Sequence, residues 1–207
     1  MSISIVGSGG IAGGNSTVAE FIAPANVLAD DLFVMACIAN PTTYDFPTPT
    51  GWTAGPVVSI SSTARAKVFW RWADGAEDAT AQGWTGGQWV TTSRKGIAWA
   101  CIRGADKTAW NGLADAARFG TGFTSSAATT SCPTVSQAGT AAVVSLWNER
   151  TSTVTTSTTL VPPAGHTLTT SITWTSGGGI CQGAVAYSLA DDTDGSVGSG
   201  CRPSDSP

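Results

Sequence analysis

The segment Ala66-Lys67-Val68-Phe69-Trp70-Arg71-Trp72 alternates in side-chain character from one residue to the next. Because successive side chains of a β-strand point to opposite faces of a sheet, this period of two predicts a strand. It places Val68, Trp70 and Trp72 together on one face and Phe69 on the other. We expect the face with both tryptophans to be buried, since large aromatic rings are used to fill the space between sheets.

The same alternation recurs along the chain. In Gly96–Arg103, the residues Ile97, Trp99 and Cys101 share one face, and we expect Trp99 to be buried. No stretch carries a sustained apolar stripe with the 3.6-residue period of a helix. The chain is therefore predicted to be all-β, an antiparallel β-sandwich of jelly-roll type. The further candidate strands are Ser2–Val6, Thr17–Ile22, Leu32–Ala39, Val57–Ser61, Ala141–Trp147, Thr153–Leu160, Leu168–Trp174 and Val185–Leu189.

Composition limits the classes of function. The 207 residues carry a net charge of −4, with 12% charged residues, and the basic side chains form no stripe that would bind nucleic acid. The apolar run Leu32–Ala39 is too short to span a bilayer, and no cationic segment precedes Ile3–Val6, so we expect neither membrane insertion nor a signal peptide. We expect one domain over residues 1–194, followed by a polar tail or arm over residues 195–207.

A weak internal sequence repeat relates the two halves of the chain. Residues 49–53 read Pro-Thr-Gly-Trp-Thr, and residues 163–167 read Pro-Ala-Gly-His-Thr. Each motif follows an apolar candidate strand and precedes a second strand that ends in Ala-Asp. This order predicts two similar half-sheets that face each other.

The chain has five cysteines, an odd number that does not suit a complete disulfide framework. Cys37 and Cys101 lie within apolar strands, where a free thiol packs as a small hydrophobic group. A disulfide among Cys132, Cys181 and Cys201 remains open. No Cys-x-x-Cys pair is present, and we expect no metal site built on cysteine.

Residues 7–12, Gly-Ser-Gly-Gly-Ile-Ala, match the Gly-x-Gly-x-x-Ala pattern of dinucleotide-binding folds. That pattern needs a helix directly after the glycines, and Gly13-Gly14-Asn15 would break such a helix. We therefore interpret these glycines as a turn and expect no nucleotide cofactor.

Catalytic groups are scarce. The single histidine, His166, lies in a turn motif where the first half of the chain has Trp52. Carboxylate pairs could serve glycoside hydrolysis, but each lies at a strand end, where aspartate commonly binds the local backbone. These pairs are Asp30 with Asp31, Asp74 with Glu77 and Asp78, and Asp191 with Asp192. We expect no catalytic residues and no cofactor.

Two weaker motifs could bind a ligand. The spacing Asp192-Thr193-Asp194-Gly195 resembles part of a calcium loop, but no bidentate glutamate follows, so we interpret it as a turn with weak calcium binding as the alternative. Trp84, Trp89 and Trp110 stand in glycine-rich or loop contexts. They are the candidate contacts to a glycan or a protein partner, because exposed aromatic rings stack on such ligands.

The order of these features resembles a family of β-sandwich virion proteins of tailed phages, especially phages of actinobacteria. The resemblance covers roughly residues 15–195 and rests on short motifs. Ala29, Ala105 and His166 depart from the Gly, Val and Trp that the family pattern has at those places. The segments that carry it are Ala29-Asp30-Asp31-Leu32-Phe33-Val34, Pro49-Thr50-Gly51-Trp52-Thr53, Ala66–Ala73, Ile102-Arg103-Gly104-Ala105-Asp106, Pro162–Thr167 and Ala186–Ala190.

The resemblance implies a non-enzymatic structural protein located in the virion, either a minor tail protein or a capsid-decoration subunit. Such a subunit would dock on other virion proteins and expose a surface to solvent or to the host. Its low charge favours a homo-oligomer, with a trimer as the preferred form, or a subunit bound in the lattice of a larger assembly. The alternative is a carbohydrate-binding module that recognises bacterial surface glycans.

Overall fold

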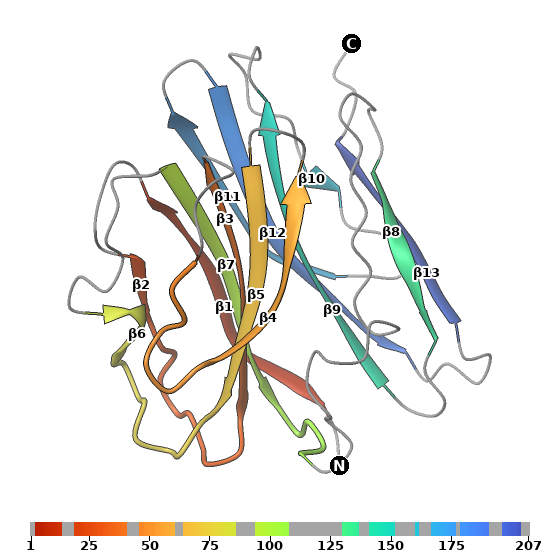
Figure 1. Ribbon diagram of the computed structural model, residues 1–207. Helices are drawn as coiled ribbons and strands as arrows, with labels where there is room; N and C mark the ends of the chain where they lie inside the picture. The colour runs from red at the N-terminus through yellow and green to blue at the C-terminus, as the bar shows by residue number, and fades with distance from the viewer. Residues whose placement is uncertain are drawn as a thin grey trace.

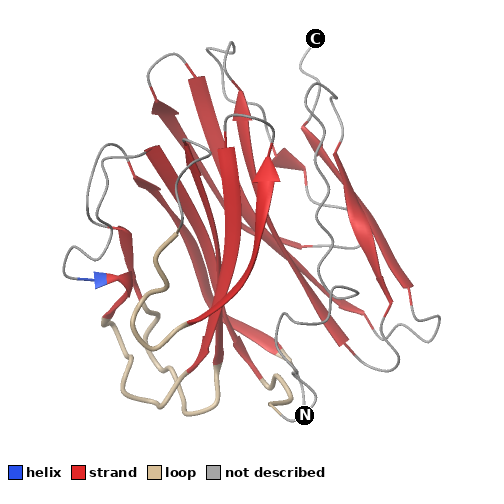
Figure 2. Ribbon diagram, viewed as in Figure 1, coloured by secondary structure: helices blue, strands red, loops and turns tan. Residues whose placement is uncertain are grey.

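The computed structural model describes most of the chain as antiparallel β-strands. The described residues are 3–13, 19–40, 46–60, 64–85, 94–107, 130–136, 141–151, 160–161, 167–176, 179–190 and 196–203. They contain no α-helix, and almost all of the regular structure in Figure 2 is strand. The all-β prediction is confirmed. No helix in the described part is long and apolar enough to cross a membrane.

The largest sheet has five antiparallel strands in the order β1-β7-β3-β5-β4 (Figure 1). A separate two-stranded sheet pairs β2 with β6. The bounds are β1 Ser4–Gly13, β2 Ala19–Ile22, β3 Leu32–Asn40, β4 Thr53–Ile60, β5 Ala64–Trp72, β6 Ala81–Trp84 and β7 Arg94–Arg103.

The second half of the chain forms two three-stranded sheets, β11-β12-β9 and β10-β13-β8. In the first of these, β11 lies beside β1, β12 beside β7 and β9 beside β3. That matching order gives the two sheets a sandwich-like arrangement. The bounds are β8 Thr130–Ser136, β9 Ala141–Thr151, β10 Leu160–Val161, β11 Thr167–Ser176, β12 Gly179–Ala190 and β13 Ser196–Pro203.

Strand β13 falls in the segment that the sequence predicts to be a polar tail. It pairs with both β8 and β10 of the same chain, so this segment is the central strand of a sheet. Strand pairing uses the backbone N–H and C=O groups, which every residue except proline supplies in full. Polar, glycine-rich composition therefore did not reveal the pairing.

The predicted internal repeat has a counterpart in the topology. The strand order β3-β5-β4 in the large sheet, which we call the first unit, recurs as β9-β12-β11 in the three-stranded sheet, the second unit. In the first unit Trp70 of β5 pairs with Val34 and Thr53, on the two neighbouring strands. The pairing register shifts just after the second residue of β4, at Ala54.

The second unit reproduces these relationships. Tyr187 of β12 pairs with Val144 of β9 and with Thr167, the first residue of β11. The register again shifts after the second residue of the outer strand, at Leu168. Thr53 and Thr167 are the last residues of the two repeated motifs. Each is also the first residue of the outer strand of its unit, β4 or β11.

The main core lies between one face of the large sheet and the layer that contains β2 and β6. Within it, Trp99 stacks on Phe21 with ring centroids 4.4 Å apart and planes inclined by 14°. The expected burial of Trp99 is confirmed, at 7% exposure. Other aromatic members of this cluster are Phe33, Phe46, Trp52, Phe69 and Trp84.

The two faces of β5 are assigned the wrong way round by the sequence pattern. Phe69 is fully buried in the main core, whereas Trp70 and Trp72 are only partly buried on the opposite face. The second sheet lies along β1, β7 and β3, so β5 lies to one side of it. Both faces of this strand carry aromatic rings, and size alone did not identify the buried one.

The glycines of residues 7–12 form part of β1, so the prediction of a turn there is wrong. Gly9 lies under the indole of Trp99, and a Cβ at this position would stand 3.0 Å from the ring. At Gly7 a Cβ would stand 2.8 Å from the Pro24 Cβ. The glycines therefore let β1 pass close to bulky neighbours.

Replacing Trp99 with alanine should destabilise the fold by about 3–5 kcal/mol, the usual cost of a large cavity in a packed core. Trp70→Ala should cost about 1–2 kcal/mol, because a partly buried ring loses less contact area on truncation. Urea unfolding of both variants measures the difference. Equal costs would contradict the assignment of the two faces.

Candidate functional site

Charged residues gather where β3 begins and where β5 and β7 end, and we call this region the polar end. Leu32, the first residue of β3, pairs with Trp72 and with Ile102. The antiparallel pairing therefore brings the loops before β3 and after β5 and β7 together. The polar end comprises Asp30, Asp31, Arg71, Asp74, Glu77, Asp78, Arg103 and Lys107.

Backbone hydrogen bonds join the β2–β3 loop to the β5–β6 loop. The Ala73 N–H donates to the carbonyl of Asp31 at 2.8 Å, and the Asp30 N–H donates to the carbonyl of Ala73 at 3.0 Å. Near the other end of the loops, the Ala23 N–H donates to the carbonyl of Thr80 at 2.9 Å. These bonds make the two loops one connected layer.

The carboxylate of Asp31 is 2% exposed and fully engaged. Arg103 donates to both of its oxygens, from Nε at 3.0 Å and from Nη2 at 2.7 Å. The Leu28 N–H donates to Oδ2 at 2.8 Å. The hydrogen bond to Asp31 raises the pKa of Arg103, which also donates to the carbonyl of Asn26. Asp31 therefore holds a loop in shape and has no free oxygen for proton transfer.

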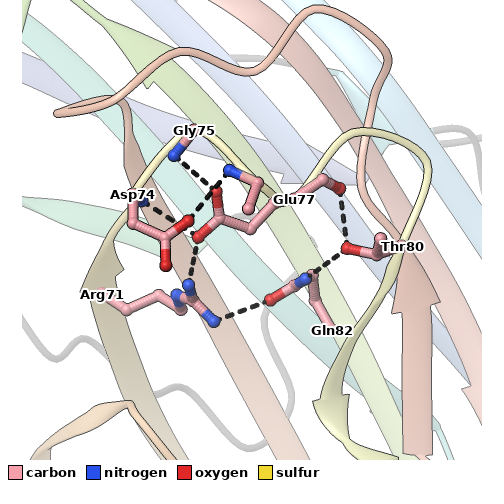
Figure 3. A network of polar contacts seen from close by, with 7 residues as sticks. Arg71, Asp74, Gly75, Glu77, Thr80 and Gln82 are labelled. Atoms are coloured by element: carbon pink, nitrogen blue, oxygen red, sulfur yellow. Dashed lines mark hydrogen bonds and ion pairs between the residues drawn. The ribbon is translucent and has the colours of Figure 1, made fainter.

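Glu77 organises the β5–β6 loop in the same way (Figure 3). Its carboxylate accepts from the N–H groups of Asp74 and Gly75, at 3.1 and 3.0 Å, and pairs with Arg71. Arg71 also donates to Gln82 at 3.0 Å. The Arg71 Nε–H is, within the described residues, the one buried side-chain polar atom without a partner.

The remaining carboxylates of the polar end have local roles. Asp78 accepts from the Val27 N–H at 2.5 Å, and Asp74 accepts from the Ala76 N–H at 2.9 Å. Asp30 is exposed and pairs with Lys107 at 2.6 Å. The described carboxylates that were candidates for acid–base chemistry thus bind turns and cations. Asp191 and Asp192, the third candidate pair, lie outside the described residues.

No metal-binding group emerges from the described residues, because no three His, Cys, Asp or Glu side chains are arranged to hold an ion. The calcium-like residues Asp192 and Asp194 lie outside the described part of the chain, as does His166.

Trp84 is fully buried, so its prediction as a surface contact is wrong. Its ring meets Phe69 edge to face at 5.1 Å, and its indole N–H donates to the carbonyl of Pro47 at 2.6 Å. The glycines around it suggested a loop, but Trp84 ends strand β6. The other two candidates, Trp89 and Trp110, lie outside the described residues.

Among the residues whose side chains are described, the partly exposed tryptophans lie on the face of β5 formed by Val68, Trp70 and Trp72, which we call the Trp70–Trp72 face. These side chains also pack against a second buried cluster, made of Leu32, Val34, Ala98, Ala100 and Ile102. The ammonium of Lys107 lies 5.6 Å from the centre of the Trp72 ring, a cation–π distance. Two tryptophans two residues apart on one strand indicate this face in the sequence, but not that its rings are only partly buried.

Cys37 and Cys101 are buried and form no disulfide, as predicted. Burial, and next the nearby carboxylate of Asp31, raise the pKa of the Cys101 thiol to about 12. The register places Cys132 of β8 opposite Ser199 of β13, two residues from Cys201, whereas Cys181 is in another sheet.

No protein-family model, curated protein or solved structure matches this chain. The resemblance to phage virion proteins therefore rests on the short motifs of the chain itself.

Replacing Glu77 with glutamine should destabilise the fold by about 2–3 kcal/mol, because the largely buried cation of Arg71 loses its counter-ion. Asp74→Asn, in the same loop but exposed, is the matched control and should cost less than about 1 kcal/mol. Denaturant unfolding at pH 7 gives both values. A Glu77 variant as stable as the control would contradict the role of Glu77 in organising the loop.

The raised pKa of Cys101 makes stability depend on alkaline pH. A thiol whose pKa rises from 9.0 to about 12 on folding stabilises the protein fully below pH 9, and that contribution is lost as the pH climbs toward 12. The free energy of unfolding, measured in reducing buffer, should fall over this range. It should fall less steeply in Cys101→Ala, and identical slopes would contradict the pKa shift.

Proposed function

We propose that the chain is a non-enzymatic structural protein of a tailed-phage virion, a minor tail protein or a capsid-decoration subunit. Its stacked sheets would form a β-sandwich of jelly-roll type. It would assemble as a homo-oligomer in the virion, dock on other virion proteins and expose its remaining surface to solvent or to the host.

The observation that carries this proposal is the use of the charged groups at the polar end. Asp31, Glu77 and Asp78 bind loop N–H groups, and two arginines lock the first two carboxylates in place. Such groups stiffen a domain without offering a free acid or base. A rigid, weakly charged domain suits a subunit that is packed many times into one particle.

The alternative, a carbohydrate-binding module, is favoured by the Trp70–Trp72 face. Partly exposed indoles can stack on sugar rings, and the polar groups beside them can bind sugar hydroxyls. Lys107 and Asp30 lie next to Trp72 and would supply such groups.

Immunogold labelling tests the virion role directly. Phage particles from a host that carries this gene should bind antibody against the protein at a fixed place, tail or capsid. Purified protein should show no turnover of cell-wall polysaccharides. Particles that form and infect normally without the protein, and never bind the antibody, would refute the proposal.

Glycan binding is tested by calorimetry with host cell-wall polysaccharide. If the alternative holds, Trp72→Ala should weaken binding at least tenfold, a loss of about 1.4 kcal/mol. Leu28→Ala, another exposed apolar residue, is the control and should bind like the wild type. Absence of binding by the wild-type protein would dismiss this alternative.

A further inference from the structure

Leu28 lies in the β2–β3 loop and is 55% exposed. Asp31 holds the backbone of Leu28 on both sides. The Leu28 N–H donates to the Asp31 carboxylate at 2.8 Å, and the Leu28 carbonyl accepts the N–H of Asp31 at 3.1 Å. The preceding N–H, that of Val27, donates to Asp78 at 2.5 Å, and Val27 itself is buried. A turn with a fixed backbone therefore presents an apolar side chain to solvent.

The neighbouring β5–β6 loop contacts this turn without covering Leu28. A Cβ on Gly75 would stand 3.1 Å from the backbone nitrogen of Ala29, so the two loops meet there. Ala29 and Gly75 are small, and both are exposed. Within the described residues of the two loops, Leu28 is the one large apolar residue that is exposed. Its side chain therefore stands out from small neighbours.

Three exposed aspartates flank Leu28. Asp78 binds the N–H of the residue before Leu28, and Asp30 follows Leu28 two residues later. Asp74 lies in the part of the β5–β6 loop that meets the turn. Asp30 is paired with Lys107, whereas no ion pair among the described residues includes Asp74 or Asp78. We call Leu28 with these three aspartates the Leu28 surface.

The net charge exposed on this surface is negative, because the two arginines of the polar end bind the buried carboxylates of Asp31 and Glu77. An apolar centre with a polar rim is the usual anatomy of a protein interface. Complementary charge on the partner steers association and fixes the orientation. A surface whose backbone is already fixed also loses little conformational freedom on binding. The complementary surface is an apolar pocket bordered by lysine or arginine.

We infer that the protein docks on another virion protein through the Leu28 surface, and that this partner offers an apolar pocket with a basic border. The inference names the surface and the partner chemistry for the docking proposed above, and it rests on that part of the proposal.

Incorporation into phage particles tests the docking. A phage that lacks this gene is grown in a host that supplies the protein from a plasmid, and the amount per particle is measured by immunoblot. Leu28→Asp should leave about tenfold less protein per particle than the wild type, because it replaces the apolar centre with a charge. Val57→Asp is the matched control, since Val57 is exposed on β4, and it should incorporate like the wild type. Circular dichroism of both purified variants checks that they fold.

The charge of the partner has its own test. Asp74→Lys reverses one charge of the rim and leaves Leu28 in place, so it should also lower the amount per particle. Incorporation of Asp74→Lys at the wild-type level would overturn the basic border of the partner.

The other outcomes separate this inference from the proposed function. Normal incorporation of Leu28→Asp, or an equal loss with Val57→Asp, would overturn the Leu28 surface but leave the virion role standing. Purified wild-type oligomers that Leu28→Asp dissociates would show that a second copy occupies the surface, which also overturns the inference. Particles that never contain the wild-type protein would overturn both.

Discussion

The buried carboxylate of Asp31 is the constraint on which the first half of the structure depends. Asp31 directly precedes β3, and its carboxylate binds Arg103 at the end of β7. The backbone carbonyl of Asp31 accepts the N–H of Ala73, just after β5. One residue thus connects the ends of the three central strands of the large sheet. Because the Asp31 oxygens also hold the Leu28 N–H, the loop before β3 is set by the same group. The polar end follows from this arrangement.

Burial of both sheet faces explains the unusual composition. In β3, every residue from Leu32 to Cys37 is buried, and β7 is buried from Gly96 to Ile102, because each strand has a layer on either side. Such strands leave no solvent-facing positions for charged residues. Alanines such as Ala98 and Ala100 occupy one face of β7, and the larger Ile97 and Trp99 occupy the other. A protein built around such strands can be weakly charged and still fold.

The sequence predicts many of the strands because alternation depends only on local geometry, but it misses β6, β8 and β13. The candidate strand Thr153–Leu160 lies almost wholly outside the described residues. The sequence does not predict which face is covered when both are apolar, as the exchange of Phe69 and Trp70 shows. The sequence also misleads about glycine, which occurs both in turns and within strands. Glycine marks turns, but Gly9 makes room for Trp99 within a strand, and the glycines around Trp84 hid β6, which no alternation marked. At the polar end, sequence alone favoured a structural role for the carboxylates, but only the fold reveals their partners.

The two edge strands of the large sheet, β1 and β4, contain no charged residue. Asp30, Asp74 and Lys107 remain exposed at the polar end, where they keep water around the loops without crossing a strand edge. The edge strand β4 carries no charge at all, so its protection comes from Pro56 and the register shift over half its length. The proline and the register shift leave Val57–Ile60 as the part of this edge strand that pairs regularly with β5.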